Sequence, residues 1–144
     1  MELTAKEILV KARNKIAEPE NWCKISAAKK KHNQRGNTFT FDGFISCAVE
    51  DPEASQWCAT GAVNSVIPHG LFCENMVPRR KALCALDASC PAYTIIDYND
   101  NRHTSHNEIL DVFEKAIEIA DILAVFDRAI EAAEQQEEQE QNDG

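Results

Sequence analysis

The longest apolar pattern in this sequence lies near its C-terminus, and it predicts one long helix over residues 106–133. Ser105-His106-Asn107-Glu108 has the form of a capping box, in which a hydroxyl and a carboxylate bind the first free amides of a helix. Apolar residues then recur at helical spacing: Ile109, Val112, Phe113, Ala116, Ala120, Leu123, Phe126 and Ile130. Five more apolar positions make the pattern wider than a surface helix needs: Leu110, Ile117, Ile122, Val125 and Ala129. We therefore expect the helix either to cross the core or to project beyond Ala120 and pair with a second copy of the chain.

Local signals upstream predict three shorter helices. Thr4-Ala5-Lys6-Glu7 is a second capping box, and the helix that it opens must end before Pro19. Two more helices are expected over residues 54–67 and 79–89. Glycine in a helix interior is unfavourable by about 1 kcal/mol relative to alanine, so Gly61 indicates that another element approaches closely there.

The remaining patterns favour a small sheet element. Thr38-Phe39-Thr40-Phe41 alternates polar with aromatic residues, Asp42-Gly43 is a favoured turn dipeptide, and residues 44–49 follow as a second β-favouring run. Residues 93–96 also favour extended structure, before a polar turn over residues 97–104. The predicted fold class is α+β and predominantly helical, with four helices, a small hairpin or sheet element and a long C-terminal helix.

Charge is divided unevenly along the chain, whose formal net charge is −9. Residues 1–36 carry a net charge of +5, much of it in residues 29–35, which we interpret as a solvated loop. From Asn107 onward the net charge is −10. The overall balance disfavours non-specific attraction to nucleic acid or to an anionic membrane.

A chain of 144 residues is long enough for one compact domain with a hydrophobic core. We expect this domain over residues 1–120, a helical extension over residues 121–133 and an acidic tail over residues 134–144, frayed or disordered because it has no apolar side chain. The sequence shows neither a membrane-spanning run nor the apolar core of a signal peptide, so we expect a cytoplasmic protein. The six cysteines include no Cys-x-x-Cys pair, so we expect free, mostly buried thiols and no cofactor.

Cys58 and two histidines raise the hypothesis of a thiol hydrolase. In this hypothesis Cys58 is the nucleophile, His103 or His106 is its base, and Asp100 orients the base. Against it, Cys58 is expected well inside the helix over residues 54–67, and no oxyanion motif accompanies it. The alternative is that Cys58 is a small core residue.

A site for a nucleotide-like ligand is a second hypothesis. Trp22 and Trp57 would stack on a planar group and Arg102 would bind phosphates, with Asn99 and Asp100 beside them. The alternatives are burial of both indoles, and turn formation and capping by Asn99 and Asp100. Asp97, Asp100, His103 and His106 could together supply metal ligands. The last helix begins at Ser105, between the two histidines, so their imidazoles share no fixed face and we expect no metal site.

Four segments of the chain, in order, resemble a family: Trp22-Cys23, Trp57-Cys58-Ala59-Thr60-Gly61-Ala62, Ile96-Asp97-Tyr98-Asn99-Asp100 and Glu108-Ile109-Leu110. This family comprises small bacterial and phage proteins described as a domain of unknown function, with an aromatic-Cys-Ala-x-Gly-Ala segment and an aromatic-Asn-Asp segment before a final helix. The resemblance covers roughly residues 5–120. It implies a fold and a bacterial or phage setting, and it implies no activity.

We expect a non-catalytic, acidic binding protein rather than an enzyme. In the phage setting that the resemblance implies, such a protein would block a basic surface of a host protein. The residues expected to make this interaction are the acids of the C-terminal segment: Glu131, Glu134, Glu137, Glu138 and Glu140. A homodimer through the C-terminal helix is expected as well, whereas direct nucleic-acid binding is not. Nucleotide-like ligand binding and thiol hydrolysis remain the alternatives.

Overall fold

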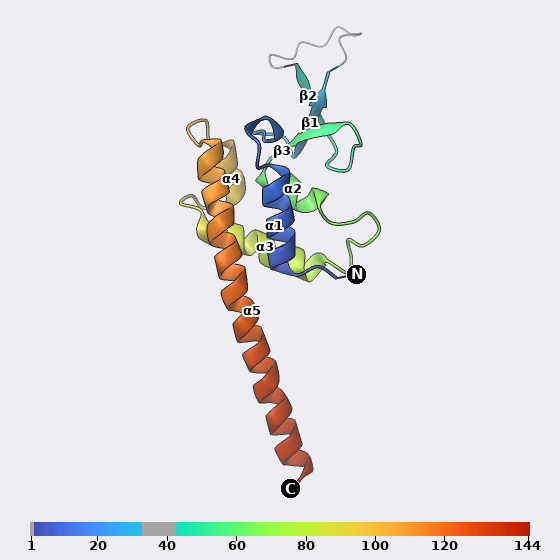
Figure 1. Ribbon diagram of the computed structural model, residues 1–144, viewed down its shortest axis with the longest axis vertical. Helices are drawn as coiled ribbons and strands as arrows, with labels where there is room; N and C mark the ends of the chain where they lie inside the picture. The colour runs from blue at the N-terminus through green and yellow to red at the C-terminus, as the bar shows by residue number, and fades with distance from the viewer. Residues whose placement is uncertain (1, 33–42) are drawn as a thin grey trace.

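The computed structural model describes residues 2–32 and 43–144 of the chain (Figure 1). Within these ranges it contains five α-helices, one short 3-10 helix and a three-stranded sheet. The elements follow one another in this order: α1 Ala5–Lys15, η1 Pro19–Asn21, β1 Ala28–Lys31, β2 Phe44–Cys47, β3 Ala54–Trp57, α2 Ala59–Ser65, α3 Met76–Ser89, α4 Ile95–Asp100 and α5 His106–Asn142. The predicted α+β class, with mostly helix and a long C-terminal helix, is confirmed.

Helix α1 begins and ends where its local signals place it. The Thr4 hydroxyl accepts a hydrogen bond from the Glu7 amide (3.1 Å), and the Glu7 carboxylate accepts one from the Thr4 amide (2.7 Å). This capping box satisfies amides that have no partner within the helix. The helix ends at Lys15, before Pro19 starts η1. The predicted first helix is therefore confirmed.

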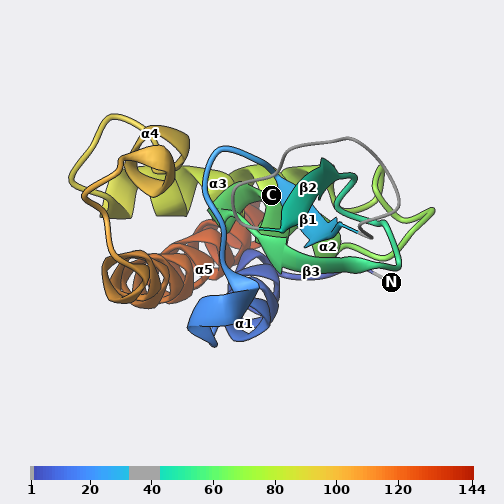
Figure 2. The ribbon, with the colours of Figure 1, turned by 90° about the horizontal axis from the view of Figure 1, so that it is seen from above.

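The hydrophobic core lies between α1, α2, α3 and the first half of α5. Seen from above, α1 and α3 lie beside α5 (Figure 2). The largest fully buried side chains include Ile8 and Leu9 from α1, Leu86 from α3, and Ile109 and Phe113 from α5. Burial of these side chains is the main favourable contribution to folding.

The sheet is antiparallel, with strand order β2-β1-β3 and β1 in the centre. Ala28 pairs with Cys47 on one side and with Trp57 on the other. Strand β2 falls within the predicted second run of the hairpin, whereas residues 38–41, its predicted first run, lie outside the described residues. The prediction of a solvated loop is wrong for residues 29–31, which form most of β1. Pairing on both edges satisfies the backbone of β1, and Lys30 forms ion pairs with nearby carboxylates.

The predicted helix over residues 54–67 is divided between a strand and a helix. Residues 54–57 form β3, because pairing with β1 satisfies their backbone, and α2 follows at Ala59. Cys58 is the N-cap of α2, so the prediction that it lies well inside a helix is wrong. The close approach predicted at Gly61 is confirmed: a Cβ atom there would lie 1.8 Å from the carbonyl oxygen of Ala27.

Helix α4 covers residues 95–100, so the predictions of extended structure at 95–96 and of a polar turn at 97–100 are wrong, whereas residues 102–103 do form a turn. The Thr94 hydroxyl accepts a hydrogen bond from the Asp97 amide (3.1 Å) and caps the helix. Ile95 and Asn99 are both buried at the i, i+4 spacing of one helix face. A capping residue and two buried positions thus outweigh the β preference of the short apolar run.

Helices α3 and α5 are both longer than predicted. α3 begins at Met76 rather than at residue 79, with Pro78 in its first turn, where a missing amide is harmless. α5 begins at the predicted capping box of Ser105 and Glu108 and continues to Asn142, through residues for which we expected a frayed or disordered tail. Glutamate and glutamine favour helix, which accounts for the continuation. Over the described ranges, no helix combines the length and apolarity that crossing a bilayer requires.

Candidate functional site

Asn99 joins three segments that are far apart in the sequence. Its Oδ1 atom accepts hydrogen bonds from Trp22 Nε1 (2.8 Å) and from the Ala59 amide (3.1 Å). Its Nδ2 atom donates to the carbonyl of Cys23 (3.2 Å) and to Asp100 Oδ1 (2.9 Å). The side chain is 1% exposed, and these four bonds use the full hydrogen-bonding capacity of an amide. Asn99 therefore connects α4 to the segment of Trp22 and Cys23 and to the start of α2.

Both tryptophans are half-buried and have protein cations over their rings. Lys24 Nζ lies 5.3 Å from the ring centroid of Trp22, and the ring of His106 lies 5.7 Å from the same indole. Lys15 Nζ lies 4.3 Å from the ring centroid of Trp57. Such contacts are attractive because the ring face carries partial negative charge. The protein itself thus supplies partners to the rings that were expected to stack on a planar ligand.

The structure gives Cys58 and the two predicted histidines separate hydrogen-bond partners. Cys58 is 8% exposed, and its Sγ atom accepts a hydrogen bond from the Gly61 amide (3.3 Å). His106 Nε2 donates to a backbone carbonyl at the end of α1 (2.6 Å). His103 is exposed, and its Nε2 atom accepts from Arg102 Nε (3.0 Å). None of these hydrogen bonds joins a predicted histidine to the Cys58 thiol.

A small pocket of about 140 Å³ lies beside Cys58, Asn99 and Asp100. Ile25 lines it with a φ of 74°, a left-handed conformation that is rare for a β-branched residue. The Ile25 amide donates to Asp100 Oδ1 (2.8 Å), which holds the segment in place. The pocket is smaller than the roughly 300–1,000 Å³ that is typical of small-molecule sites. It brings together some of the residues predicted for a ligand site without the room for a nucleotide.

All six cysteines of the chain are free thiols, but only Cys23 and Cys58 are buried, so the prediction that most of the thiols are buried is wrong. Burial raises the pKa of the Cys23 thiol to about 12 and also raises the pKa of Cys47. Cys23 is therefore protonated at neutral pH. Over residues 2–32 and 43–144, no three or more His, Cys, Asp or Glu side chains are grouped so that they could hold a metal ion.

Helix α5 changes its surroundings at Ala120. Up to this residue the helix contributes buried side chains to the core, whereas every residue from 121 to the end of the chain is exposed. Figure 1 shows the helix leaving the domain in this region and ending far from it. Five large apolar side chains lie on the exposed part, each 48–61% exposed: Ile122, Leu123, Val125, Phe126 and Ile130. The five predicted interaction acids lie on the same segment, beyond these apolar residues.

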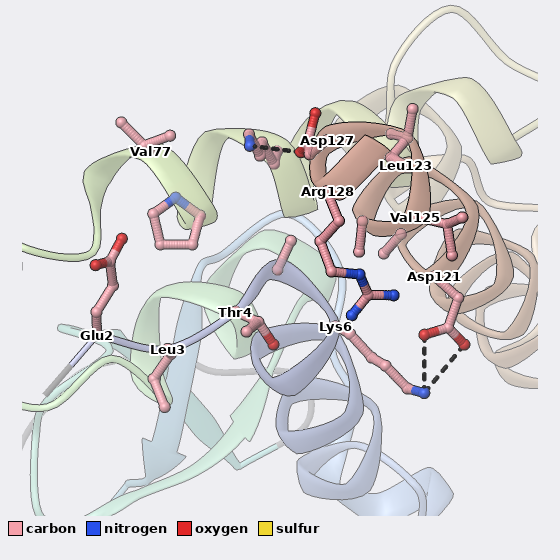
Figure 3. A pocket seen from close by; sticks show the side chains of 15 residues that line it. Glu2, Leu3, Thr4, Lys6, Val77, Asp121, Leu123, Val125, Asp127 and Arg128 are labelled. Carbon is pink, nitrogen blue, oxygen red and sulfur yellow. Dashed lines mark hydrogen bonds and ion pairs between the residues drawn. The ribbon is translucent and has the colours of Figure 1, made fainter. Parts of the chain in front are cut away.

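A groove of about 680 Å³ lies where α5 leaves the domain, between this helix and the starts of α1 and α3 (Figure 3). Two ion pairs cross it: Lys6 Nζ is 2.9 Å from Asp121 Oδ1, and Lys81 Nζ is 3.2 Å from Asp127 Oδ2. In the view of Figure 3, Arg128 lies between the two pairs. About half of each side chain is exposed, so each pair contributes at most about 1 kcal/mol. Together they connect the first turns of the projecting segment to α1 and α3.

The groove was not predicted from the sequence. Lys6 and Asp121 are 115 positions apart, and Lys81 and Asp127 are 46 positions apart. No spacing rule connects residues at such separations. Only the width of the apolar pattern, which exceeds what the core can cover, indicated that the helix continues outside the domain.

No curated protein and no solved structure matches this chain. The sequence profile of a family of unknown function, DUF6197, matches residues 1–119. The matched range includes the tryptophans, Cys58 and Asn99, and it ends at the point where α5 leaves the core. The resemblance to a domain-of-unknown-function family is therefore confirmed, while the bacterial or phage setting stays a prediction. On this match, the chain belongs to the family of unknown function DUF6197.

Proposed function

We propose that this protein is a non-catalytic binding protein that uses the projecting part of α5, residues 121–142, to contact a partner protein with a basic surface. The observation that carries this proposal is that every residue of that segment is exposed, including five large apolar ones. Exposed apolar groups of this size, bordered by polar residues, mark surfaces that bind other proteins. By contrast, Asn99 and Cys58 form hydrogen bonds within the domain, and so do the two histidines predicted for the thiol-hydrolase site.

The charge of the segment supports a basic partner. Residues 121–144 include eight acids and a single base, Arg128. Two of the acids are engaged by Lys6 and Lys81, and both lie in the first turns. The C-terminal end of α5 lies away from the domain (Figure 1), and the acids on it are all exposed: Glu131, Glu134, Glu137, Glu138 and Glu140. A helix that carries this charge attracts basic surfaces over distances that depend on the salt concentration.

The proposal includes the setting of the protein as well. We take the protein to act in the cytoplasm and, in the phage setting that the motif resemblance implies, to cover a basic surface of a host protein. A continuous helix suits this role because its backbone needs little further ordering when it binds.

Affinity capture with a variant whose distal glutamates are neutralised tests this proposal. The full chain is immobilised and exposed to lysate of the source cells, beside a variant in which the five distal glutamates are replaced by glutamine. Glutamine keeps the size and the helix preference of glutamate, so the variant changes only charge. We expect basic proteins to bind the native chain, to be lost at high salt and to be absent from the variant.

The matched control neutralises the same number of acids on the domain: Glu2→Gln, Glu18→Gln, Glu20→Gln, Glu50→Gln and Asp111→Asn. All five are exposed, so this control should capture the same proteins as the native chain. Equal capture by the native chain and the distal glutamine variant would refute the proposal. Failure of the native chain to capture any basic protein would refute it as well.

A further inference from the structure

Helix α5 carries an apolar stripe formed by Ile119, Ile122, Phe126, Ile130 and Ala133. The intervals between these residues are three, four, four and three positions, so the pattern is the same from either end, with Phe126 at its centre. At 3.6 residues per turn, all five positions fall on one face of the helix. Ile119 is half-buried against the core, whereas Ile122, Phe126 and Ile130 are 55–61% exposed and Ala133 is exposed as well, so the stripe from Ile122 onward is left uncovered by side chains within the described ranges.

Charged residues continue the same symmetrical spacing at both ends of the stripe. Lys115 lies four positions before Ile119, and Glu137 lies four positions after Ala133. Both side chains are exposed. The pattern is thus symmetrical in position and opposite in charge.

We propose that a second copy of this chain covers the stripe, in an antiparallel pair of α5 helices with Phe126 on the two-fold axis. In this arrangement Phe126 meets Phe126 of the partner, and Ile122 of each copy meets Ile130 of the other. A two-fold axis requires such a self-complementary surface. The pairing involves two copies of this chain alone. It would cover three of the five exposed apolar side chains and engage Glu137, so the basic partner proposed above would contact the acids that lie off the stripe.

Charge selects the antiparallel direction. In an antiparallel pair Lys115 of each copy meets Glu137 of the other, and Ile119 meets Ala133. A parallel pair in register would instead place Lys115 beside Lys115 and Glu137 beside Glu137, which is unfavourable. The overlap between Lys115 and Glu137 extends for roughly 33 Å at about 1.5 Å per residue.

The fold leaves room for this arrangement. Within the domain the antiparallel partner must lie along the side of α5 on which Asp111, Lys115 and Glu118 are exposed, next to the face that packs on the core. Figure 2 shows α5 at the margin of the domain. The groove of Figure 3 lies on another side of the helix, so the pairing leaves it open. Helical spacing also places Glu131 and Glu138 away from the stripe, where they remain accessible to a basic partner.

Sedimentation equilibrium of the purified full chain tests the pairing. We expect a monomer–dimer equilibrium with a substantial dimer population at about 100 µM. Phe126→Glu places two carboxylates together on the axis and should raise the dissociation constant on the order of 100-fold or more. Glutamate favours helix, so far-UV circular dichroism should show unchanged helix content. The matched control is Val125→Glu, since Val125 is 57% exposed and lies off the stripe; its dissociation constant should stay near that of the native chain.

A charge exchange tests the direction. Lys115→Glu and Glu137→Lys should each raise the dissociation constant by about 3- to 10-fold, and the double variant should restore it, because each exchanged residue again meets its opposite. Any of three results would overturn the proposal. The native chain could be monomeric at about 100 µM, Val125→Glu and Phe126→Glu could raise the dissociation constant equally, or the double variant could dimerise more weakly than both single variants. Sedimentation equilibrium of the variant with five distal glutamines shows whether that variant still forms the dimer. It therefore distinguishes loss of pairing from loss of binding to the basic partner.

Discussion

Replacing Asn99 by alanine removes the side chain that connects α4 to the segment of Trp22 and Cys23 and to α2. The change leaves Trp22 Nε1 and the amide of Ala59 without an acceptor, and the carbonyl of Cys23 without this donor. A buried polar group that loses its partner costs about 1–3 kcal/mol, so three such groups predict a loss of roughly 3–9 kcal/mol in the free energy of unfolding. A domain of this size is stable by about 5–15 kcal/mol, so Asn99→Ala should be close to unfolding at room temperature.

Asn99→Asp separates the acceptor role from the donor role. The new side chain still offers an oxygen to Trp22 and Ala59, but its second oxygen faces the carbonyl of Cys23 and the carboxylate of Asp100. When protonated it can donate there, and when ionised it is repelled, so its pKa in the folded state is raised above about 3.9. The folded state then holds this proton more tightly than the unfolded state. The stability of Asn99→Asp relative to the native chain should therefore fall as pH rises above about 4.

Urea denaturation of the full chain, followed by circular dichroism and tryptophan fluorescence, measures both effects. The matched control is Asn107→Ala, because Asn107 is exposed in the first turn of α5, and its free energy of unfolding should change by less than about 0.5 kcal/mol. If Asn99→Ala loses less than about 1 kcal/mol, or if the stability of Asn99→Asp relative to the native chain is independent of pH, the role assigned to Asn99 is refuted.

Three further predictions concern other parts of the domain. Gly61→Ala should lower the free energy of unfolding by at least about 2 kcal/mol, since its Cβ atom would overlap the carbonyl of Ala27; a stable variant in thermal denaturation would contradict this. The hydrogen bond from the Tyr98 hydroxyl lowers the pKa of Glu108, so the stability that the Glu108 carboxylate contributes is present at neutral pH and is lost on acidification. Below about pH 4.3 the Glu108→Gln variant should therefore lose less stability than the native chain does. Cys58 should react with iodoacetamide more slowly than the exposed Cys73 in peptide mapping, whereas faster labelling of Cys58 would favour the thiol-hydrolase hypothesis.

The elements that could be predicted from the sequence are those fixed by residues close together in the chain. Each capping box acts within four positions, so the starts of α1 and α5 could be predicted to the residue. The apolar periodicity of α5 extends over many turns and therefore indicated its type and its excess width.

The errors fall on short segments whose neighbours in space decide their structure. Residues 54–57 carry no strong preference, and their pairing with β1 makes them a strand. Residues 95–96 favour strand locally and residues 97–100 favour a turn, but burial of Ile95 and Asn99 on one face makes this segment helical. The same limit applies to the site. The residues Trp22, Cys58 and Asn99 could be singled out from the sequence, but their role in holding the domain together depends on contacts between segments 40 to 77 positions apart.

The unbroken course of α5 across Ala120 restricts how this segment can change in length. Inserting or deleting one residue in a helix turns everything beyond it by about 100° and shifts it by about 1.5 Å along the axis. A change of that kind between the core and Phe126 would move the stripe to a different side of the molecule, although each side chain in it is unaltered. Changes of about seven or eleven residues nearly restore the original direction. We therefore expect relatives with a similar projecting helix to differ there by substitution or by whole groups of turns, and seldom by a single residue.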